Sequence, residues 1–140
     1  MAEAFQFELV SPEALVLSGD AHEVVVPGKE GYFTVLANHA PFMSSVKPGV
    51  VDVVMADGAK SQIFVRGGFA DVSPSGFTLL AEQAVPLKDF DMAELDRQIV
   101  DAGEDVRDAD GEKKVAAQAR LAQLEEARDA VKLATGSGAH

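Results

Sequence analysis

The 140-residue sequence contains no cysteine, no tryptophan and a single tyrosine. The absence of cysteine excludes a disulfide framework and any metal site ligated by thiolates. No apolar run approaches the ~18 residues of a membrane-spanning helix, so the sequence predicts none. The N-terminal segment lacks both the basic-then-apolar pattern of a signal peptide and an Arg-rich amphipathic stretch. This lack predicts that the product remains in the compartment where it is made.

Basic residues are also scarce. Twelve Lys and Arg residues face 23 Asp and Glu residues, and the formal net charge is −11. Nucleic acids and anionic lipid surfaces repel such a chain, and the basic residues form no stripe that would offset the repulsion. The sequence therefore predicts no binding to nucleic acid, and membrane association only through a protein partner. The apolar fraction of 47% still supports a folded core.

Up to about residue 87 the sequence has the period of β-strands. Apolar and polar residues alternate over 5–10, and further runs are expected as separate strands, the first at 14–18 and the next at 23–27, which is rich in β-branched residues. Ala56-Asp57-Gly58 separates two such runs and predicts a hairpin, because Asp-Gly adopts positive φ at low cost. Turn signals recur every ~8 to 12 residues, which predicts a sandwich or a flattened barrel. Parallel pairing is not expected, since no crossover helix is available.

Beyond Lys88 the period changes to that of helices. Asp91 is expected to cap a first helix, with Glu94 as its reciprocal partner three residues later. The apolar seam of this helix comprises Met92, Leu95, Ile99, Ala102 and Val106. A second, alanine-rich helix is predicted from about residue 112 to 134, with an apolar side formed by Val115, Ala119, Ala122, Leu124, Ala127 and Val131. We therefore predict a β-domain at 1–87 and a helical hairpin at 88–140, frayed over 135–140.

Three motifs could carry chemistry, and none meets its full requirement. Gly28 and Gly31 lack the spacing and the following Lys-Ser/Thr of a phosphate loop, so we interpret 27–32 as an exposed contact turn. His39 has no partner histidine at metal-ligand spacing, and we expect it to order its loop or to face a partner. Asp108 and Asp110 match only part of a calcium loop. No nucleophile–base pair is evident, and the sequence predicts no catalysis, cofactor or metal.

Two stretches resemble the signature of the epsilon subunit of bacterial F-type ATP synthases. The first, over 24–50, contains P-G-K-E-G-Y, V-L-A-N-H-A-P and K-P-G. The second contains R-G-G-F-A-D-V-S from Arg66 and the later A-E. The likeness covers nearly the whole chain. It implies a β-sandwich of about ten strands followed by a C-terminal antiparallel α-helical hairpin. It also implies a noncatalytic rotor subunit of the central stalk.

The resemblance implies two partners for the sandwich. A ring of membrane c subunits would be contacted by Pro27, Gly28, Lys29, Glu30, Gly31 and Tyr32. The gamma subunit would be contacted by Ser11, His39, Ala40, Pro41, Phe42, Gly67, Gly68 and Phe69. The expected function is to couple ring rotation to gamma and the catalytic head, for ATP synthesis driven by a proton gradient. The expected location is the cytoplasmic face of the bacterial inner membrane.

The sequence departs from the family pattern at positions that concern regulation. Some members bind ATP through an L-D-x-x-R-A motif, but Leu95-Asp96 is followed here by Ile99 and Val100, so we expect no nucleotide binding. The family's hairpin can contact the alpha and beta subunits and inhibit ATP hydrolysis through basic residues. Beyond Lys88 this chain has thirteen acidic and seven basic residues. Repulsion from an acidic partner segment predicts weak inhibition.

Two interpretations from other classes fit the composition less well. A stand-alone β-sandwich ligand-binding module with a helical dimerisation tail would need an aromatic pocket, yet the chain has no Trp and one Tyr. A cupin-like enzyme would need a histidine pair that the sequence lacks.

Overall fold

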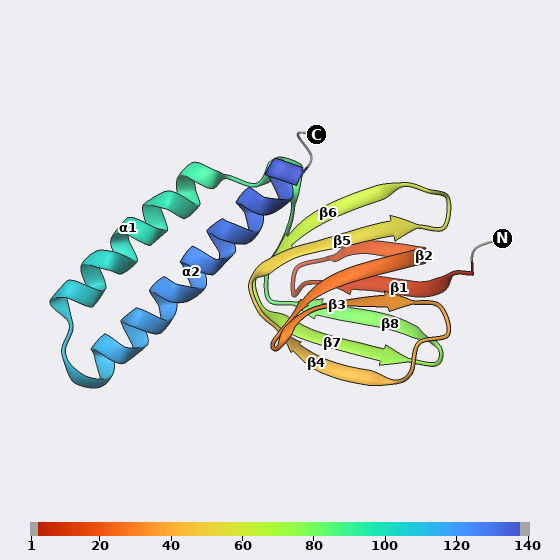
Figure 1. Ribbon diagram of the computed structural model, residues 1–140, viewed down its shortest axis with the longest axis horizontal. Helices are drawn as coiled ribbons and strands as arrows, with labels where there is room; N and C mark the ends of the chain where they lie inside the picture. Colours follow the sequence, from red (N-terminus) through yellow and green to blue (C-terminus); the bar gives the residue numbers. More distant parts are fainter. Residues whose placement is uncertain (1–2, 138–140) are drawn as a thin grey trace. The chain divides into compact units, whose positions relative to one another are not determined.

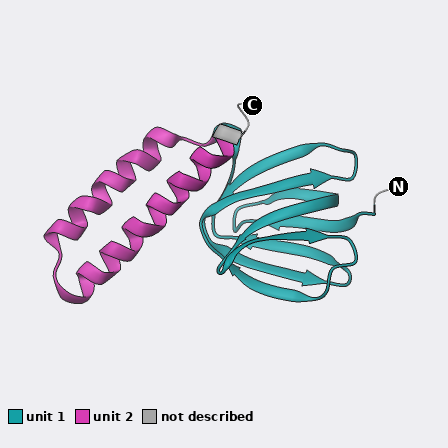
Figure 2. Ribbon diagram, viewed as in Figure 1, with its two compact units in different colours: residues 1–89 teal, residues 90–140 magenta. Residues whose placement is uncertain are grey.

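The alternating run at the start of the chain forms β1 (Phe5–Val10), and its three inward side chains are buried. The structure is a computed structural model that describes residues 3–137. The chain divides into two compact units, unit 1 (Met1–Asp89) and unit 2 (Phe90–His140), and β1 is the first strand of unit 1 (Figure 2). The described part of unit 1 continues with β2 (Leu15–Gly28), β3 (Gly31–Leu36), β4 (Phe42–Val46), β5 (Gly49–Met55), β6 (Lys60–Val65), β7 (Gly68–Ser73), β8 (Gly76–Ala81), β9 (Ala84–Pro86) and the 3-10 turn η1 (Leu87–Asp89).

The nine strands form one hydrogen-bonded sheet that folds over itself as a sandwich (Figure 1). Its order is β1-β8-β7-β4-β2-β5-β6-β9, with β3 on β2. An additional β1–β2 pairing closes β1, β8, β7, β4 and β2 into a ring. The predicted sandwich followed by a helical hairpin is confirmed, with nine strands in the described residues in place of about ten.

Two features of the sheet differ from the sequence-based expectation. The runs expected as separate strands at 14–18 and 23–27 are parts of the single strand β2, because Gly19, at a φ of 149°, and a register shift between Ala21 and Glu23 absorb the bend inside the strand. β1 and β8 pair in parallel, which we did not expect. The whole series from β2 to β7 serves as their connection, so no crossover helix is needed.

The core of unit 1 lies between the layers. Phe7, Leu9, Val24 and Val26 are fully buried, and the ring of Phe7 lies 5.3 Å from that of Phe77. No polar or charged residue is buried in the described part of the chain. Each large apolar side chain of this core stabilises the fold by about 1.5–3 kcal/mol. The core therefore fixes the strand register on which the surface positions depend.

Unit 2 begins with α1 (Met92–Asp108), and its predicted cap is confirmed. The amide of Glu94 donates a 3.0 Å hydrogen bond to the Asp91 side chain. The Glu94 carboxylate does not serve as the expected reciprocal partner, because it pairs with Arg97 at 2.8 Å and accepts from Gln98. Leu95 and Ala102 of the predicted seam are buried.

The second helix, α2 (Gly111–Ser137), packs against α1, but its predicted apolar side is only half right. Leu124, Ala127 and Val131 are buried, whereas Val115 is 66% exposed. At about 100° per residue, Val115 lies about 180° around the helix from Leu124, on the opposite face. Ala119 and Ala122 are exposed for the same reason.

The fraying expected for 135–140 stays a prediction. α2 continues through Ser137, and the Thr135 hydroxyl donates to the Val131 carbonyl at 2.9 Å, inside the helix. Residues 138–140, which were included in that prediction, lie outside the described residues. Neither helix, over the described range, has the length and apolar character needed to cross a bilayer.

Candidate functional site: two surfaces of the sandwich

The β2–β3 hairpin ends in a short polar tip. Gly28 pairs with Gly31, which leaves Lys29 and Glu30 as an exposed two-residue turn. Gly31 has a φ of 134°, a conformation that a side chain would strain. Six residues were predicted to contact a ring of c subunits. Pro27 and Gly28 are buried, so the accessible part of this predicted contact comprises Lys29, Glu30, Gly31 and Tyr32.

Backbone hydrogen bonds hold this tip to the neighbouring strand. The Lys29 amide donates to the Ser45 carbonyl at 2.9 Å, and the Lys47 amide donates to the Pro27 carbonyl at 3.0 Å. The tip is therefore continuous with β4 and with the residues that follow it, and it projects as part of the sheet.

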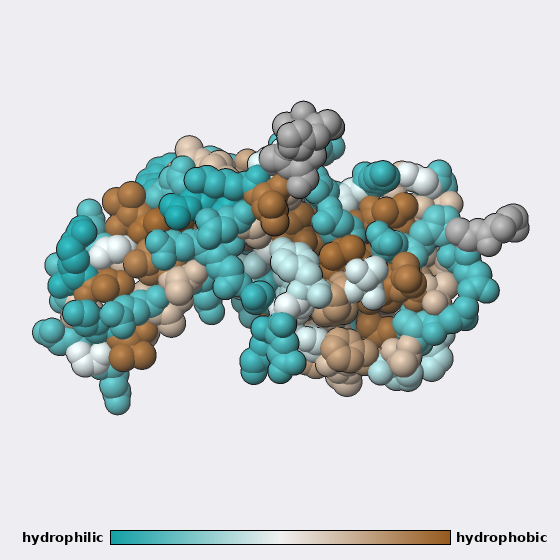
Figure 3. All heavy atoms as spheres, viewed as in Figure 1, coloured by the Kyte–Doolittle hydropathy of each residue, from teal (hydrophilic) through white to brown (hydrophobic). Residues whose placement is uncertain are grey.

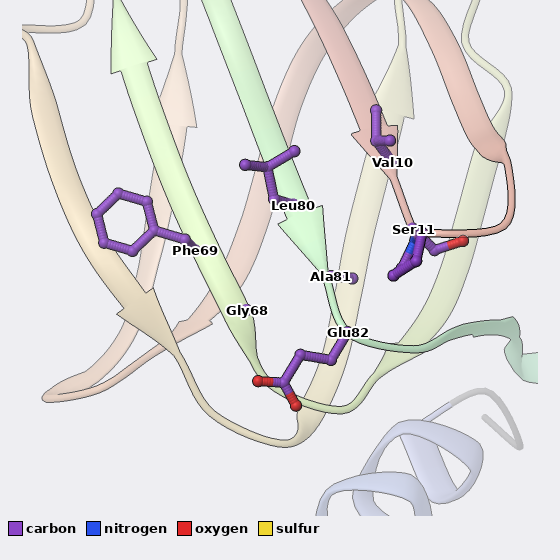
Figure 4. Close-up of a pocket in the computed structure, with 8 residues that line it drawn as sticks. Val10, Ser11, Gly68, Phe69, Leu80, Ala81 and Glu82 are labelled. Atoms are coloured by element: carbon purple, nitrogen blue, oxygen red, sulfur yellow. The ribbon is translucent and has the colours of Figure 1, made fainter.

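An apolar row crosses three strands on the outer face of unit 1. The register places Phe69 of β7 beside Leu80 of β8, and Leu80 beside Val10 of β1. Leu80 is 50% exposed and Phe69 is 37% exposed. Figure 4 shows the three side chains on these adjacent strands. Exposed apolar side chains gathered in this way are typical of a protein-binding surface.

A shallow pocket includes this apolar row and lies near one end of the three strands (Figure 4). Its volume is about 500 Å³, and it is lined by Val10, Ser11, Pro12, Gly68, Phe69, Leu80, Ala81 and Glu82. Ser11, Gly68 and Phe69, predicted to contact gamma, therefore come together. Val10 and Leu80 were missed, although each is an apolar residue at an outward position of its strand.

Gly68 allows the close approach of the two strands beneath the pocket. A Cβ at this position would lie 2.0 Å from the Leu80 carbonyl oxygen, and the φ of Gly68 is 142°. The preceding Gly67, at a φ of 72°, makes the turn into β7. Both glycines of the predicted contact element thus shape the backbone at the end of the pocket.

His39 lies at the other end of β7. Its Nδ1 is 2.7 Å from the Leu36 carbonyl oxygen, its Nε2 is 2.7 Å from that of Ser73, and its ring meets Phe5 edge-on at 5.5 Å. A neutral imidazole can donate only one of these hydrogen bonds, whereas a protonated one can donate both. His39 therefore orders its loop, one of the two roles expected for it.

The alternation of side chains puts Phe42 on the same face of β4 as the buried Val46, but Phe42 is 50% exposed at the start of the strand. Its partner in β7 is the core residue Val72, and its ring packs against Phe33 at 5.2 Å. Phe69 is three residues from Val72 and faces the opposite side, because side chains alternate along a strand.

The structure thus divides the predicted gamma-contact residues between two places. Ser11 and the segment 67–69 lie at one end of β7, and the segment 39–42 lies near the other end. The five steps from Gly68 to Ser73 span about 16 Å at about 3.3 Å per residue.

The polar tip and the apolar pocket lie at the same end of the sandwich. A row of paired residues runs from Gly28 to Val46, then to Gly68 and Ala81. Three strand spacings of about 4.8 Å put the ends of this row about 14 Å apart. One end of unit 1 therefore presents a charged loop and an apolar hollow side by side.

The helical unit carries its negative charge mainly on α1. α1 has six acidic and two basic residues, whereas α2 has four acidic and five basic residues. On the face shown in Figure 3, hydrophilic residues cover much of this unit, with hydrophobic patches between them. Ile99, at the position where the ATP-binding motif has arginine, is half-buried in α1.

The turn between the helices contains the residues that partly matched a calcium loop. Asp108 ends α1, and Asp110 directly precedes Gly111, the first residue of α2. Over residues 3–137, no three His, Cys, Asp or Glu side chains are grouped so that they could hold a metal ion.

Comparison with known proteins places these surfaces in a family context. Residues 4–87 match the family described as ATP synthase, Delta/Epsilon chain, beta-sandwich domain. The ATP synthase epsilon chain of Mesorhizobium japonicum is 54% identical over 125 residues, which cover 89% of this chain and 93% of that protein. The epsilon chain of Parvibaculum lavamentivorans is 48% identical over 132 residues, covering 94% of this chain and all of that protein.

Solved structures share the fold at low sequence identity. A chain in the Euglena gracilis mitochondrial ATP synthase, solved with OSCP, F1 and c-ring, has a TM-score of 0.78 at 22% identity, over 94% of this chain and 81% of that one. A chain from the central stalk and c-ring of the Tetrahymena thermophila mitochondrial ATP synthase has a TM-score of 0.67 at 14% identity, over 95% and 97%.

Proposed function

The chain belongs to the ATP synthase delta/epsilon family and is a noncatalytic rotor subunit of ATP synthase, and from this premise we propose that its sandwich couples a c-subunit ring to a gamma subunit. The observation that carries the proposal is the shared end of unit 1, where the polar tip and the apolar pocket adjoin. A subunit that joins two partners needs two separate surfaces, and the charged tip and the apolar pocket supply two on one sheet.

The tip at 29–32 is the surface proposed for the ring. Lys29 and Glu30 offer one charge of each sign, which suits polar loops better than a lipid surface. The backbone bonds to Ser45 and from Lys47 keep the tip in the register of the sheet. Lateral force on the tip is therefore carried into hydrogen-bonded strands.

The apolar row is the surface proposed for gamma. Val10, Phe69 and Leu80 supply the apolar area, and Ser11 and Glu82 give its rim polar groups. This arrangement of an apolar centre and a polar rim is that of a specific protein interface.

The segment 39–42 extends the proposed gamma contact along the sandwich. Pro41 is exposed, and Met43, the next residue after Phe42, is 62% exposed on the same outer face as Phe69. An elongated partner laid along β4 and β7 would reach both ends of this face.

The hairpin is proposed to be a weak inhibitor of ATP hydrolysis. If α1 contacted the alpha and beta subunits, its six acidic residues would face an acidic segment. In other members of the family, basic residues of the hairpin recognise that segment, so here the two surfaces would repel each other. The half-buried Ile99 also leaves no arginine for a nucleotide phosphate at that position of α1.

The proposed setting is a proton-driven ATP synthase at the cytoplasmic face of a bacterial inner membrane. The F1 part of ATP synthase is a peripheral membrane assembly. The chain would reach the membrane through the complex, which agrees with its net charge of −11.

Crosslinking from single cysteines tests the proposal, since the chain has no cysteine of its own. In the assembled complex, Glu30→Cys should crosslink to the ring subunit and Leu80→Cys to gamma. Asp57→Cys is the matched control, because it sits in the exposed turn after β5, at the far end of that strand from Gly49. Equal labelling of the ring from positions 30 and 57 would contradict the proposal.

A further inference from the structure

The ring-contact role proposed above requires the β2–β3 tip to keep its position under load. The backbone bonds from Lys29 and Lys47 secure the side of the tip that faces β4. The other side of the tip, at the start of β3, pairs only with β2 among the described strands. The residue that secures the second flank therefore determines how rigidly Lys29 and Glu30 are presented.

We infer that Tyr32 is a positioning residue for this tip, acting through a hydrogen bond between its hydroxyl and the start of β5. The Val50 amide donates to the Tyr32 Oη at 3.3 Å. Tyr32 directly follows Gly31 at the exit of the turn, and Val50 is the second residue of β5. The bond therefore joins the exit flank of the tip to the start of β5, a strand with which β3 itself does not pair.

Gly49 forms the seat of the Tyr32 hydroxyl. A Cβ at this position would lie 2.8 Å from the Tyr32 Oη and 2.8 Å from the Pro27 Cβ. The absence of a side chain lets the phenol lie over the backbone and reach the Val50 amide. Gly49 is buried, whereas Tyr32 remains 52% exposed. One edge of the ring thus bonds the sheet while the other stays available to a partner.

The inference rests on the proposed ring contact, and its first test uses the isolated full-length chain. Tyr32→Phe removes the hydroxyl and keeps the ring. The Val50 amide should then exchange its hydrogen roughly fivefold faster, as expected for the loss of one ordinary hydrogen bond. Thr34→Val is the control, because it removes an exposed hydroxyl two residues further along β3. Equal exchange at Val50 in both variants would overturn the inference.

A second measurement uses the only tyrosine as a native probe. The chain has no tryptophan, so its fluorescence reports on Tyr32 alone. Gly49→Ala should displace the phenol and lower the anisotropy of tyrosine emission. An unchanged anisotropy in folded Gly49→Ala protein would contradict the proposed seat. If Gly49→Ala does not fold, the exchange experiment with Tyr32→Phe decides whether the Tyr32 hydroxyl binds the Val50 amide.

The functional test is made in the reconstituted ATP synthase complex. Tyr32→Phe should lower the number of protons pumped per ATP hydrolysed and the yield of the Glu30→Cys crosslink to the ring, whereas Thr34→Val should change neither. Faster exchange at Val50 with unchanged pumping and crosslinking would overturn the positioning role. If Glu30→Cys gives no crosslink to the ring in a chain that keeps Tyr32, the proposed ring contact is refuted. The exchange experiment with Tyr32→Phe still tests the hydrogen bond to Val50 in that case.

Discussion

The Nε2 atom of His39 lies 2.7 Å from the carbonyl oxygen of Ser73, a residue 34 positions later in the chain. The other ring nitrogen lies equally close to the Leu36 carbonyl. One imidazole thus connects the loop after β3 with the end of β7. This connection holds the segment 39–42 beside the strand whose opposite end forms the apolar pocket.

Replacing His39 should therefore weaken the sandwich. His39→Ala removes both contacts and the ring packing on Phe5, and we expect a loss of about 1–3 kcal/mol in the free energy of unfolding. Denaturant unfolding measures the change. His22→Ala, which removes a single contact to the Glu3 carbonyl, should cost less. A larger loss from the His22 variant would contradict the proposed role of His39.

Gly68→Ala should be among the most damaging glycine substitutions in unit 1. Its Cβ would lie 2.0 Å from the Leu80 carbonyl oxygen, so β7 and β8 would have to separate. We expect a loss above about 2 kcal/mol in thermal or denaturant unfolding. Gly58→Ala isolates the backbone term, because that glycine also has positive φ but no atom within 4 Å of the added Cβ. Equal losses would show that the close strand approach has no energetic role.

Gly103→Ala should have the opposite effect. Gly103 lies inside α1, and an added Cβ would meet no atom within 4 Å. Alanine should stabilise the helix by about 1 kcal/mol, since glycine loses more backbone entropy. Slower hydrogen exchange of the α1 amides in the full chain is the measurement. Faster exchange would mean that the glycine is required for the packing of α1.

The two faces of α2 should respond differently to truncation. Leu124→Ala removes a buried side chain and should cost about 2–5 kcal/mol. Val115→Ala, on the opposite face, should change the stability by less than about 0.5 kcal/mol. Hydrogen exchange of the α2 amides compares the two variants. A large effect at Val115 would reveal that the exposed face is packed in solution.

Deletion of 89–140 should leave ATP hydrolysis by the reconstituted complex nearly unchanged. The expectation follows from the six acidic residues of α1, which oppose docking on an acidic surface. The steady-state rate of hydrolysis is the measurement, with the full-length complex as the control. Strong activation on deletion would show that the hairpin inhibits despite its charge.

Features governed by neighbouring residues could be predicted from the sequence. The alternation over 5–10, the Asp-Gly hairpin and the Asp91 cap each depend on local chemistry, and the structure shows all three. The parallel β1–β8 pairing could not be predicted in this way, because it joins segments at the two ends of unit 1. The apolar face of α2 was misplaced because alanines occur on every side of that helix and give the period little contrast.

The same distinction between local and long-range features applies to the candidate surfaces. Motifs pointed to the tip and to Gly67-Gly68, since glycines mark turns in any fold. Val10 and Leu80 were missed, because the apolar row forms only when the register aligns three strands from distant parts of the sequence. The seat of Tyr32 on Gly49 was missed for the same reason.

The double pairing of β1 has a consequence for how the protein is made. β1 is synthesised first and can pair with β2 at once, but its other edge remains open until β8 emerges from the ribosome. Contacts of such long sequence separation slow folding and leave an unprotected strand edge in the nascent chain. The pocket beside Val10 forms only when that last pairing closes. Until β8 has emerged, the nascent chain lacks Leu80, the central residue of the apolar row, so the proposed gamma surface is completed only late in synthesis.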